Sequence, residues 1–391
     1  MRKLGENTIL AVCSVLFVRF GLFPSVIQAQ TTPDFTQAQA MLSLLRSCHA
    51  NRPAQNDFSH VLSLTGTELV VAQQNISRRV TVQQYREVLE SACAGKVAGV
   101  KPAEAGVRAE KGVAGLMNDV APSIIWGRDH VPLLESRLAE LRRNQSIGDA
   151  IPLARRYLPL VNQALVGQAE PVALNPKLYV VMGGRAGAAA IDNQLYYDVL
   201  ITEWRGARGN ATPMTPQQVV EFFAHETHHL GYGQILDRKK DLLKLSPAET
   251  KVWDFLAATL MEGSATLLIN GHEKLEDLEK QPDVAGYLAK VPDLLPEMEA
   301  LLQRALNGSI SEEEYDEGKL PFLDMGYHAT GAVMLAAIEK KRGLAGVMEA
   351  MADPRLLLAA YNDCADESTV KFRFEVSLAD RISRMGVRTP R

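Results

Sequence analysis

The sequence has little cysteine, little surplus charge and no internal repeat. Four cysteines in 391 residues are too few for a scaffold built from disulfides. The 42 Lys and Arg residues nearly balance the 46 Asp and Glu residues, and the net charge of −4 argues against a nucleic-acid binder that works by neutralising phosphates. The apolar fraction of 47% excludes a disordered chain, and this length encloses the core of one large or two medium domains.

The first 29 residues have the layout of a secretory signal peptide. Arg2 contributes to a basic start, an apolar stretch follows over residues 8–27, and Ala29 suits the position before cleavage. We therefore expect an exported protein, periplasmic or secreted. An anchor through residues 8–27 is the alternative, but Arg19 opposes it because a charge in mid-span is costly. No later run resembles a transmembrane helix, so no further membrane contact is expected.

Three cysteines follow the predicted cleavage site. In an exported protein Cys48 could pair with Cys93, because both fall in the N-terminal helical region, and Cys364 would then be left over. Buried, inert thiols are an equally good interpretation of all three residues.

Helical patterns flank a short central region of β character. Residues 30–170 are expected to be helical, including one helix that the Thr81-Val-Gln-Gln84 capping box begins and Gly95 ends, and another over residues 154–166. Residues 171–391 form the second region, which is either separate or continuous with the first. The predicted fold class is mainly α with a small β-sheet (α+β).

Two runs of β-branched and aromatic residues, 176–182 and 195–201, predict the strands of that sheet. The Gly/Ala-rich residues 183–190 between them suggest a hairpin. Everything after Thr215 is expected to be helical, apart from the alternating residues 370–376, which resemble a short strand.

The most informative motif is His225-Glu226-Thr227-His228-His229, which contains His-Glu-x-x-His. On a helix, the first and last of these histidines lie one turn apart on the same face, so both imidazoles reach one cation. Glu226 lies where a carboxylate could deprotonate a metal-bound water. The competing interpretation is a pair of histidines buried in the core.

The residues around the motif predict the helix that it needs. Thr215, Pro216 and Gln218 form a capping box with proline in the first turn, and Gly231 and Gly233 are expected to end the helix. The extra histidine, His228, lies about 100° around the helix from His229 and is expected outside the ligand set.

The third ligand is predicted to be Glu262. It lies on the next predicted helix, which the Ser246-Pro-Ala-Glu249 capping box begins and Gly271 ends, in the middle of an otherwise apolar stripe. A carboxylate there is costly unless it is paired or binds metal, so an ion pair with a basic residue is the alternative. His272 and Glu273 are rival ligands, but they follow the helix end in a turn expected to be exposed.

The His225-Glu226-x-x-His229 motif, followed by Glu262 on the next helix, resembles the gluzincin class of zinc metallopeptidases. The predicted strands before the motif and the Glu262-Gly-x-Ala265 string are similar to a poorly characterised family labelled zinc-dependent peptidases. The resemblance covers about residues 176–343 and implies a zincin-like fold. It implies one Zn²⁺ per chain, bound by His225, His229 and Glu262.

The resemblance also implies the reaction, which is hydrolysis of peptide bonds in a peptide or protein substrate. Glu226 would be the general base that activates the zinc-bound water. Tyr327 and then His328 are the candidates for binding the oxyanion, although Tyr327 could equally pack in the core. Many gluzincins have an acidic residue four positions after the glutamate ligand to orient a zinc histidine. This chain has Thr266 there, which provides a hydroxyl without charge.

Gluzincins also hold the substrate along the edge of a strand that precedes the metal helix. Residues 195–201 are in the position for that role, with a purely structural strand as the alternative. Two other functions stay open: a zinc-binding hydrolase for another substrate or an inactive zincin-like binding protein, and a helical interaction domain without metal. The sequence does not indicate an oligomeric state.

Overall fold

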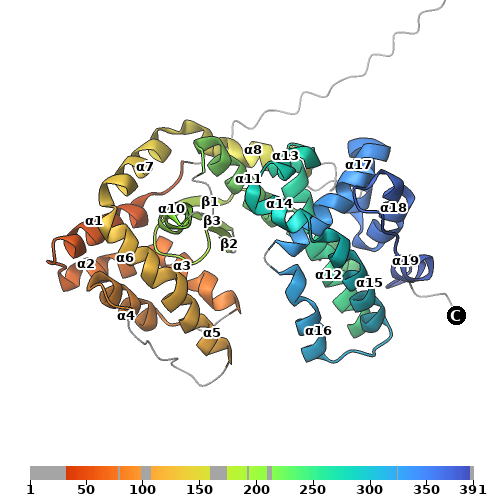
Figure 1. Ribbon diagram of the computed structural model, residues 1–391, viewed down its shortest axis with the longest axis horizontal. Helices are drawn as coiled ribbons and strands as arrows, with labels where there is room; N and C mark the ends of the chain where they lie inside the picture. The colour runs from red at the N-terminus through yellow and green to blue at the C-terminus, as the bar shows by residue number, and fades with distance from the viewer. Residues whose placement is uncertain are drawn as a thin grey trace, which may run out of the picture. The chain divides into compact units, whose positions relative to one another are not determined.

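Helices dominate the structure, and three strands form one small sheet in the middle of the chain (Figure 1). The mainly helical class with a small sheet is therefore confirmed. The computed structural model describes residues 32–77, 80–97, 107–158, 174–191, 193–208, 214–323 and 325–387. Contacts group Thr31–Arg391 into one compact unit, apart from Met1–Gln30. The predicted signal peptide and most of the helix expected over residues 154–166 lie outside the described residues.

The chain before the sheet forms short helices whose apolar faces share one core. The α-helices are α1 (Thr36–His49), α2 (Gln55–Leu62), α3 (Thr65–Ser77), α4 (Val82–Cys93), α5 (Val107–Gly115), α6 (Ala121–Asp129), α7 (Val131–Arg143) and α8 (Ala150–Arg155). A π-turn, η1 (Leu116–Val120), joins α5 to α6, and a 3₁₀ turn, η2 (Gln145–Asp149), joins α7 to α8.

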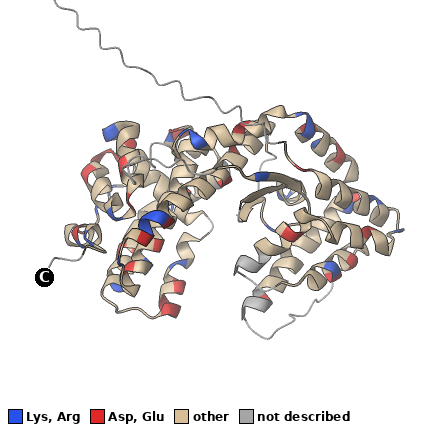
Figure 2. Cartoon of the chain, turned by 180° about the vertical axis from the view of Figure 1, so that it is seen from behind, with Lys and Arg blue, Asp and Glu red and all other residues tan. Residues whose placement is uncertain are grey.

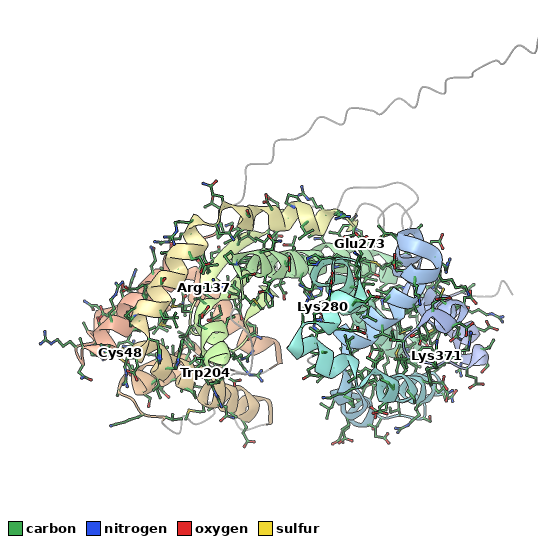
Figure 3. All side chains as sticks on the ribbon, turned by 45° about the horizontal axis from the view of Figure 1, so that its top comes forward. Cys48, Arg137, Trp204, Glu273, Lys280 and Lys371 are labelled. Atoms are coloured by element: carbon green, nitrogen blue, oxygen red, sulfur yellow. A yellow bond between two sulfur atoms is a disulfide. The ribbon has the colours of Figure 1, made fainter. Side chains whose placement is uncertain are left out.

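Local signals place the ends of α4 as predicted. The hydroxyl of Thr81 accepts a hydrogen bond from the backbone N–H of Gln84, and Gly95 follows the helix with a φ of 73°. A disulfide joins Cys48, at the end of α1, to Cys93, at the end of α4 (Figure 3 labels Cys48). Cys364 is a buried free thiol.

The sheet differs from the predicted hairpin. Its strands are β1 (Lys177–Val181), β2 (Ala188–Ile191) and β3 (Gln194–Asp198), in the spatial order β1-β3-β2. β1 is parallel to β3, and β2 is antiparallel to β3, so the predicted hairpin between β1 and β3 is wrong. The Gly/Ala-rich connection does not simply turn the chain, because its last three residues begin the strand β2.

The second predicted strand is also too long. Asp198 ends β3 and begins the helix α10 (Val199–Ala207), since its carboxylate accepts a hydrogen bond of 2.9 Å from the N–H of Ile201. The apolar residues that follow Asp198 are therefore buried on a helix. Periodicity alone does not separate a short buried helix from a buried strand.

The remainder of the described chain is helical. Its α-helices are α11 (Pro216–Leu242), α12 (Pro247–Ala265), α13 (Leu275–Glu279), α14 (Pro282–Leu288), α15 (Val291–Leu306), α16 (Glu312–Gly318), α17 (Gly326–Ala352), α18 (Leu357–Cys364) and α19 (Val376–Ser383). A π-turn, η3 (Thr266–Asn270), extends α12, and the 3₁₀ turns are η4 (Leu320–Phe322), η5 (Pro354–Leu356) and η6 (Ala365–Glu367). The prediction of a strand over residues 370–376 is wrong. The backbone of this segment is irregular up to Glu375, and the side-chain amide of Asn362 hydrogen-bonds both the N–H and the carbonyl of Phe374.

Helix α11 continues well past the glycines that were expected to end it. Gly231 serves close packing instead, because a Cβ at this position would lie 2.1 Å from Cδ1 of Leu158, just beyond α8. Gly233 has open space around its Cα, and helical backbone continues through it to Leu242.

One described helical run, Pro247–Asn270, is long and apolar enough to cross a membrane by length and composition. Its apolar window is 72% buried inside the protein, which is the behaviour of a core helix. Acidic and basic residues are interspersed over the helices (Figure 2), in keeping with the nearly balanced charge of the sequence.

Candidate metal centre

The two motif histidines lie on α11 at the spacing that the sequence predicts. The hydroxyl of Thr215 accepts a hydrogen bond from the N–H of Gln218 and begins the helix, as expected. One turn separates His225 from His229, and their ring centroids are 4.5 Å apart. α11 contacts β2 and β3 as well as α12 and η3, so both rings lie inside the protein.

Glu262 reaches these histidines from α12. Its Oε2 atom lies 3.0 Å from Nε2 of His229 and 3.6 Å from Nε2 of His225. Among the described residues, the ion pairs of Glu262 are all with histidines, which leaves the alternative of a Lys or Arg partner without support. The same oxygen is buried and has no hydrogen bond of good geometry in the described part of the chain.

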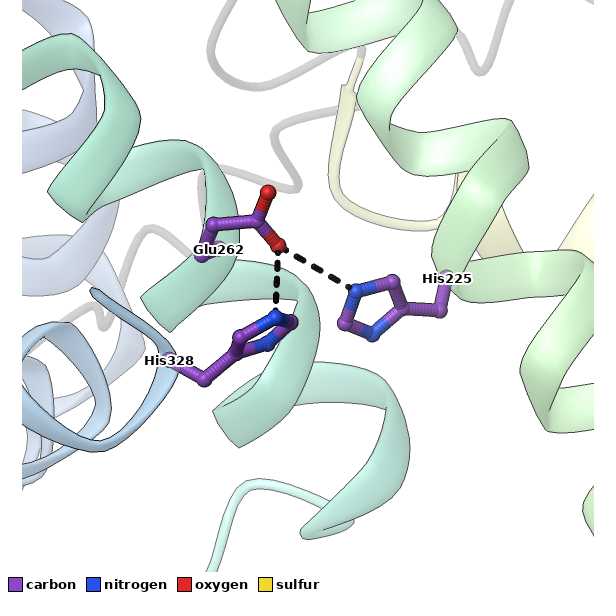
Figure 4. Close-up of side chains that lie close together, drawn as sticks. All are labelled: His225, Glu262 and His328. Atoms are coloured by element: carbon purple, nitrogen blue, oxygen red, sulfur yellow. Dashed lines mark ion pairs between the residues drawn. The ribbon is translucent and has the colours of Figure 1, made fainter. Parts of the chain in front are cut away.

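A third histidine approaches the same carboxylate oxygen. His328, in the first turn of α17, places its Nε2 atom 3.2 Å from Oε2 of Glu262. Figure 4 shows a ring nitrogen of His225 and one of His328 pointing at this oxygen, and the two rings stack with centroids 5.3 Å apart. In the described part of the chain, two groups of side chains have ligand atoms within 4.8 Å of one another: His225, Glu262 and His328, and His225, Glu226 and His229.

Close contact between α12 and α17 brings Glu262 and His328 together. Gly263 faces Gly331, and a Cβ on either residue would lie within 2.7 Å of the other residue's backbone. Because neither position carries a side chain, the two backbones approach closely beside the site.

Two residues of η3 contact the Nδ1 atoms of His225 and His328, whose Nε2 atoms face Glu262. Oδ1 of Asn270 lies 2.7 Å from Nδ1 of His225, and Oγ1 of Thr266 lies 2.9 Å from Nδ1 of His328. Thr266 therefore orients an imidazole, although its partner is on α17 rather than in the motif. Sequence reasoning missed Asn270, because an uninterrupted α-helix would turn it away from Glu262.

Burial and the Glu262 charge control protonation at the centre. Burial opposes protonation of His229, but the carboxylates of Glu262 and Glu226 outweigh it and raise its pKa to about 9. Burial favours the neutral Glu262, yet the facing histidines hold the pKa of this carboxyl well below its usual range. Burial lowers the pKa of His328 to about 4. Near neutral pH the carboxyl of Glu262 is therefore charged and the ring of His328 is neutral.

Tyr327, the residue before His328 on α17, packs among aromatic side chains. Its ring packs against Phe255 and Phe322, with centroids 5.1 and 5.8 Å away. Burial and the charge of Glu262 raise the pKa of its hydroxyl. Tyr327 also lines a pocket of about 560 Å³ with Tyr315 and other residues of α12 and α16. The structure therefore brings His328, rather than Tyr327, against the carboxylate.

The remaining histidine and glutamate candidates lie apart from this cluster. His228 is fully buried beside Tyr232, with both ring nitrogens unpaired among the described residues, and burial lowers its pKa well below the usual value. Nε2 of His272 lies 3.1 Å from the carboxylate of Glu221. Glu273 accepts a hydrogen bond of 2.6 Å from the hydroxyl of Tyr157.

The predicted substrate strand is not at an edge. β3 pairs with β1 on one side and β2 on the other, so its backbone groups are occupied by the sheet. β2 has one described partner strand and contacts α11, and its residues are partly exposed. The edge next to the motif helix therefore belongs to β2.

The residues of the centre fit a zinc ion. Two imidazole nitrogens and one carboxylate oxygen are the ligand types of catalytic zinc sites. The buried Oε2 of Glu262 lacks a hydrogen bond among the described residues, and Nε2 atoms surround it at 3.0 to 3.6 Å. A buried carboxylate without good hydrogen bonds is costly, and a cation at this point would offset that cost.

One of three comparisons with known proteins finds a match. Residues 128–369, more than half of the chain, match the model of a family described as "Putative zinc dependent peptidase (DUF5700)". This range contains every residue of the centre and extends beyond residues 176–343 at both ends. No curated protein and no solved structure matches the chain.

Proposed function

The chain belongs to the family described as "Putative zinc dependent peptidase", and on this premise we propose that it hydrolyses peptide bonds with one zinc ion. We propose His225, His229 and Glu262 as the zinc ligands. The observation that carries the proposal is the convergence of both motif histidines on Oε2 of Glu262, at 3.6 and 3.0 Å.

Bound zinc would lower the pKa of a coordinated water to about 7 and polarise the carbonyl of the scissile amide. Glu226 supplies the base. One of its oxygens lies within 4.8 Å of a ring nitrogen of each motif histidine, beside the proposed ligands. Its carboxylate takes the proton of the attacking water and then delivers a proton to the nitrogen of the leaving amine.

We assign the binding of the developing oxyanion to His328 ahead of Tyr327. Nε2 of His328 lies at the centre, 3.2 Å from Glu262, and burial keeps the ring neutral near pH 7. When the hydroxyl of Thr266 donates to Nδ1, the ring proton is on Nε2, where it can donate to an oxyanion. Tyr327 then shapes the wall of the site through its contacts with Phe255 and Phe322.

The peptide substrate would extend along β2. The backbone of Ala188–Ile191 is paired on the side of β3, and this strand contacts the motif helix. An extended peptide that adds to this edge gains main-chain hydrogen bonds, which are independent of its sequence.

We also propose that the mature protein works outside the cytoplasm, after removal of residues 1–29. The basic and apolar layout of this segment supports export. The Cys48–Cys93 disulfide supports it independently, because disulfides persist in oxidising compartments.

Glu226→Gln tests the reaction. This variant keeps the shape of the side chain and all three proposed ligands, so it should bind zinc like the wild type. We expect it to lose hydrolysis of a mixed peptide library, followed by mass spectrometry, by at least about 100-fold. Glu297→Gln, at an exposed position of α15, makes the same substitution as a control and should keep most of the activity. Equal cleavage by the Glu226→Gln variant and the wild type would contradict the mechanism.

A further inference from the structure

The π-turn η3 changes which residue of its helix faces the metal centre. Glu262 and Thr266 are four residues apart on α-helical backbone, where each residue advances about 100° around the helix axis. Thr266 therefore lies one full turn and about 40° beyond Glu262. A π-turn closes its hydrogen bond one residue later, and each residue advances by roughly 80°. The N–H of Gly271 accordingly donates to the carbonyl of Thr266, over 2.8 Å.

Over the four residues from Thr266 to Asn270, this slower advance falls about 40° short of a full turn and cancels the earlier excess. Asn270 therefore faces the same side as Glu262, two turns further along. In an uninterrupted α-helix it would lie about 80° away. The observed bond of 2.7 Å between Oδ1 of Asn270 and Nδ1 of His225 depends on this rotation.

The turn is held in place from several sides. The carbonyl of Asn270 accepts a hydrogen bond of 3.1 Å from Nε2 of Gln281. The next two residues, His272 and Glu273, have left-handed backbone with φ values of 49° and 69°. This backbone conformation is unfavourable for residues other than glycine and persists only where the surroundings fix it. Here Glu221 pairs with the first, and Tyr157 hydrogen-bonds the second (Figure 3 labels Glu273).

We propose that Asn270 is a positioning residue for the metal centre. An amide oxygen only accepts hydrogen bonds, so Nδ1 of His225 carries the proton and Nε2 carries the lone pair. Nε2 is the atom that faces Glu262. Asn270 thus fixes both the tautomer and the orientation that a metal ligand needs, and it does so without adding a charge. The part of this inference that concerns zinc rests on the proposed function.

Three variants of the full-length protein test the assignment. Asn270→Leu removes the acceptor at similar size, and Asn270→Asp restores one. Asn307→Leu is the matched control. It makes the same Asn-to-Leu substitution at the end of α15, where the amide oxygen accepts a hydrogen bond from Arg381. The zinc dissociation constant, measured by competition with a chromogenic chelator, should rise about 10- to 100-fold in Asn270→Leu alone. Asn270→Asp should bind zinc at least as tightly as the wild type.

A second measurement does not need metal. In zinc-free protein labelled with ¹⁵N at histidine, the signal of His225, identified by its loss in His225→Gln, should show protonated Nδ1. The same tautomer is expected in Asn270→Asp, and a mixture of tautomers in Asn270→Leu. A wild type that binds no zinc would refute the proposed function, and the zinc-free spectra would still decide this inference. An unchanged zinc affinity in Asn270→Leu, or an unchanged tautomer of His225 in this variant, would overturn the assignment of Asn270.

Discussion

The contact between α12 and α17 provides a sharp test of how the fold builds the site. A Cβ added at Gly331 would lie 2.1 Å from the carbonyl oxygen of Thr259 and 2.7 Å from Cα of Gly263. Both neighbours are backbone atoms, so no side-chain rotation relieves the overlap. The two helices would have to separate by about 1 Å to restore ordinary van der Waals contact.

We therefore predict that Gly331→Ala destabilises the protein by about 1–3 kcal/mol, the usual cost of overpacking a core. The effect should extend to the metal centre, because Gly331 lies one turn after His328 and Gly263 follows Glu262. Ligand distances in a metal site tolerate only about 0.2 Å, so zinc affinity should fall as well.

Gly233→Ala is the matched control for this change. It makes the same substitution within α11, where a Cβ would meet nothing within 4 Å. Helix propensity alone should then stabilise the protein by up to about 1 kcal/mol. Urea unfolding of both variants measures the difference. Equal stability of Gly331→Ala and Gly233→Ala would refute the close-contact explanation.

Three further predictions concern stability. The Cys48–Cys93 disulfide links residues 45 apart, so Cys48→Ser with Cys93→Ser should lower the free energy of unfolding by about 4 kcal/mol; no change in urea unfolding would contradict this. Burial raises the pKa of Asp198 to about 7. Between pH 4 and 7 the unfolded chain has therefore lost a proton that the folded protein keeps, and this group should lower stability by about 1.4 kcal/mol per pH unit as pH rises. Asp198→Asn should remove that part of the slope in unfolding measured at pH 5 and 7, and an unaltered slope would reject the assignment. Arg137 and Glu203 form a buried ion pair at 3.0 Å, so Glu203→Ala should destabilise by about 3 kcal/mol in the same assay; a change below 1 kcal/mol would show that the pair contributes little.

Much of the candidate site could be predicted because its signals are local. The ends of helices follow from capping residues a few positions apart, such as Thr215 with Gln218 and Ser246 with Glu249. The spacing of His225 and His229 follows from helix geometry alone. Glu262 was identifiable because a carboxylate in an apolar stripe needs a partner.

The errors arose where distant parts of the chain decide the local structure. Gly231 looked like the end of a helix, but its missing side chain accommodates Leu158, which the sequence around it cannot show. The strand order depends on β2, whose alanines carry little β propensity, and on the parallel pairing of β1 with β3. Asn270 needed a π-turn, for which the sequence gives no signal that we recognise.

The zinc content of the purified full-length protein tests the central claim most directly. Elemental mass spectrometry should be applied to the wild type, to His229→Ala and to His60→Ala, which removes an exposed histidine of α2 outside the cluster. The account predicts about one zinc per chain in the wild type and in His60→Ala, and none in His229→Ala. No zinc in the wild type after incubation with the metal, or zinc retained in His229→Ala, would contradict it.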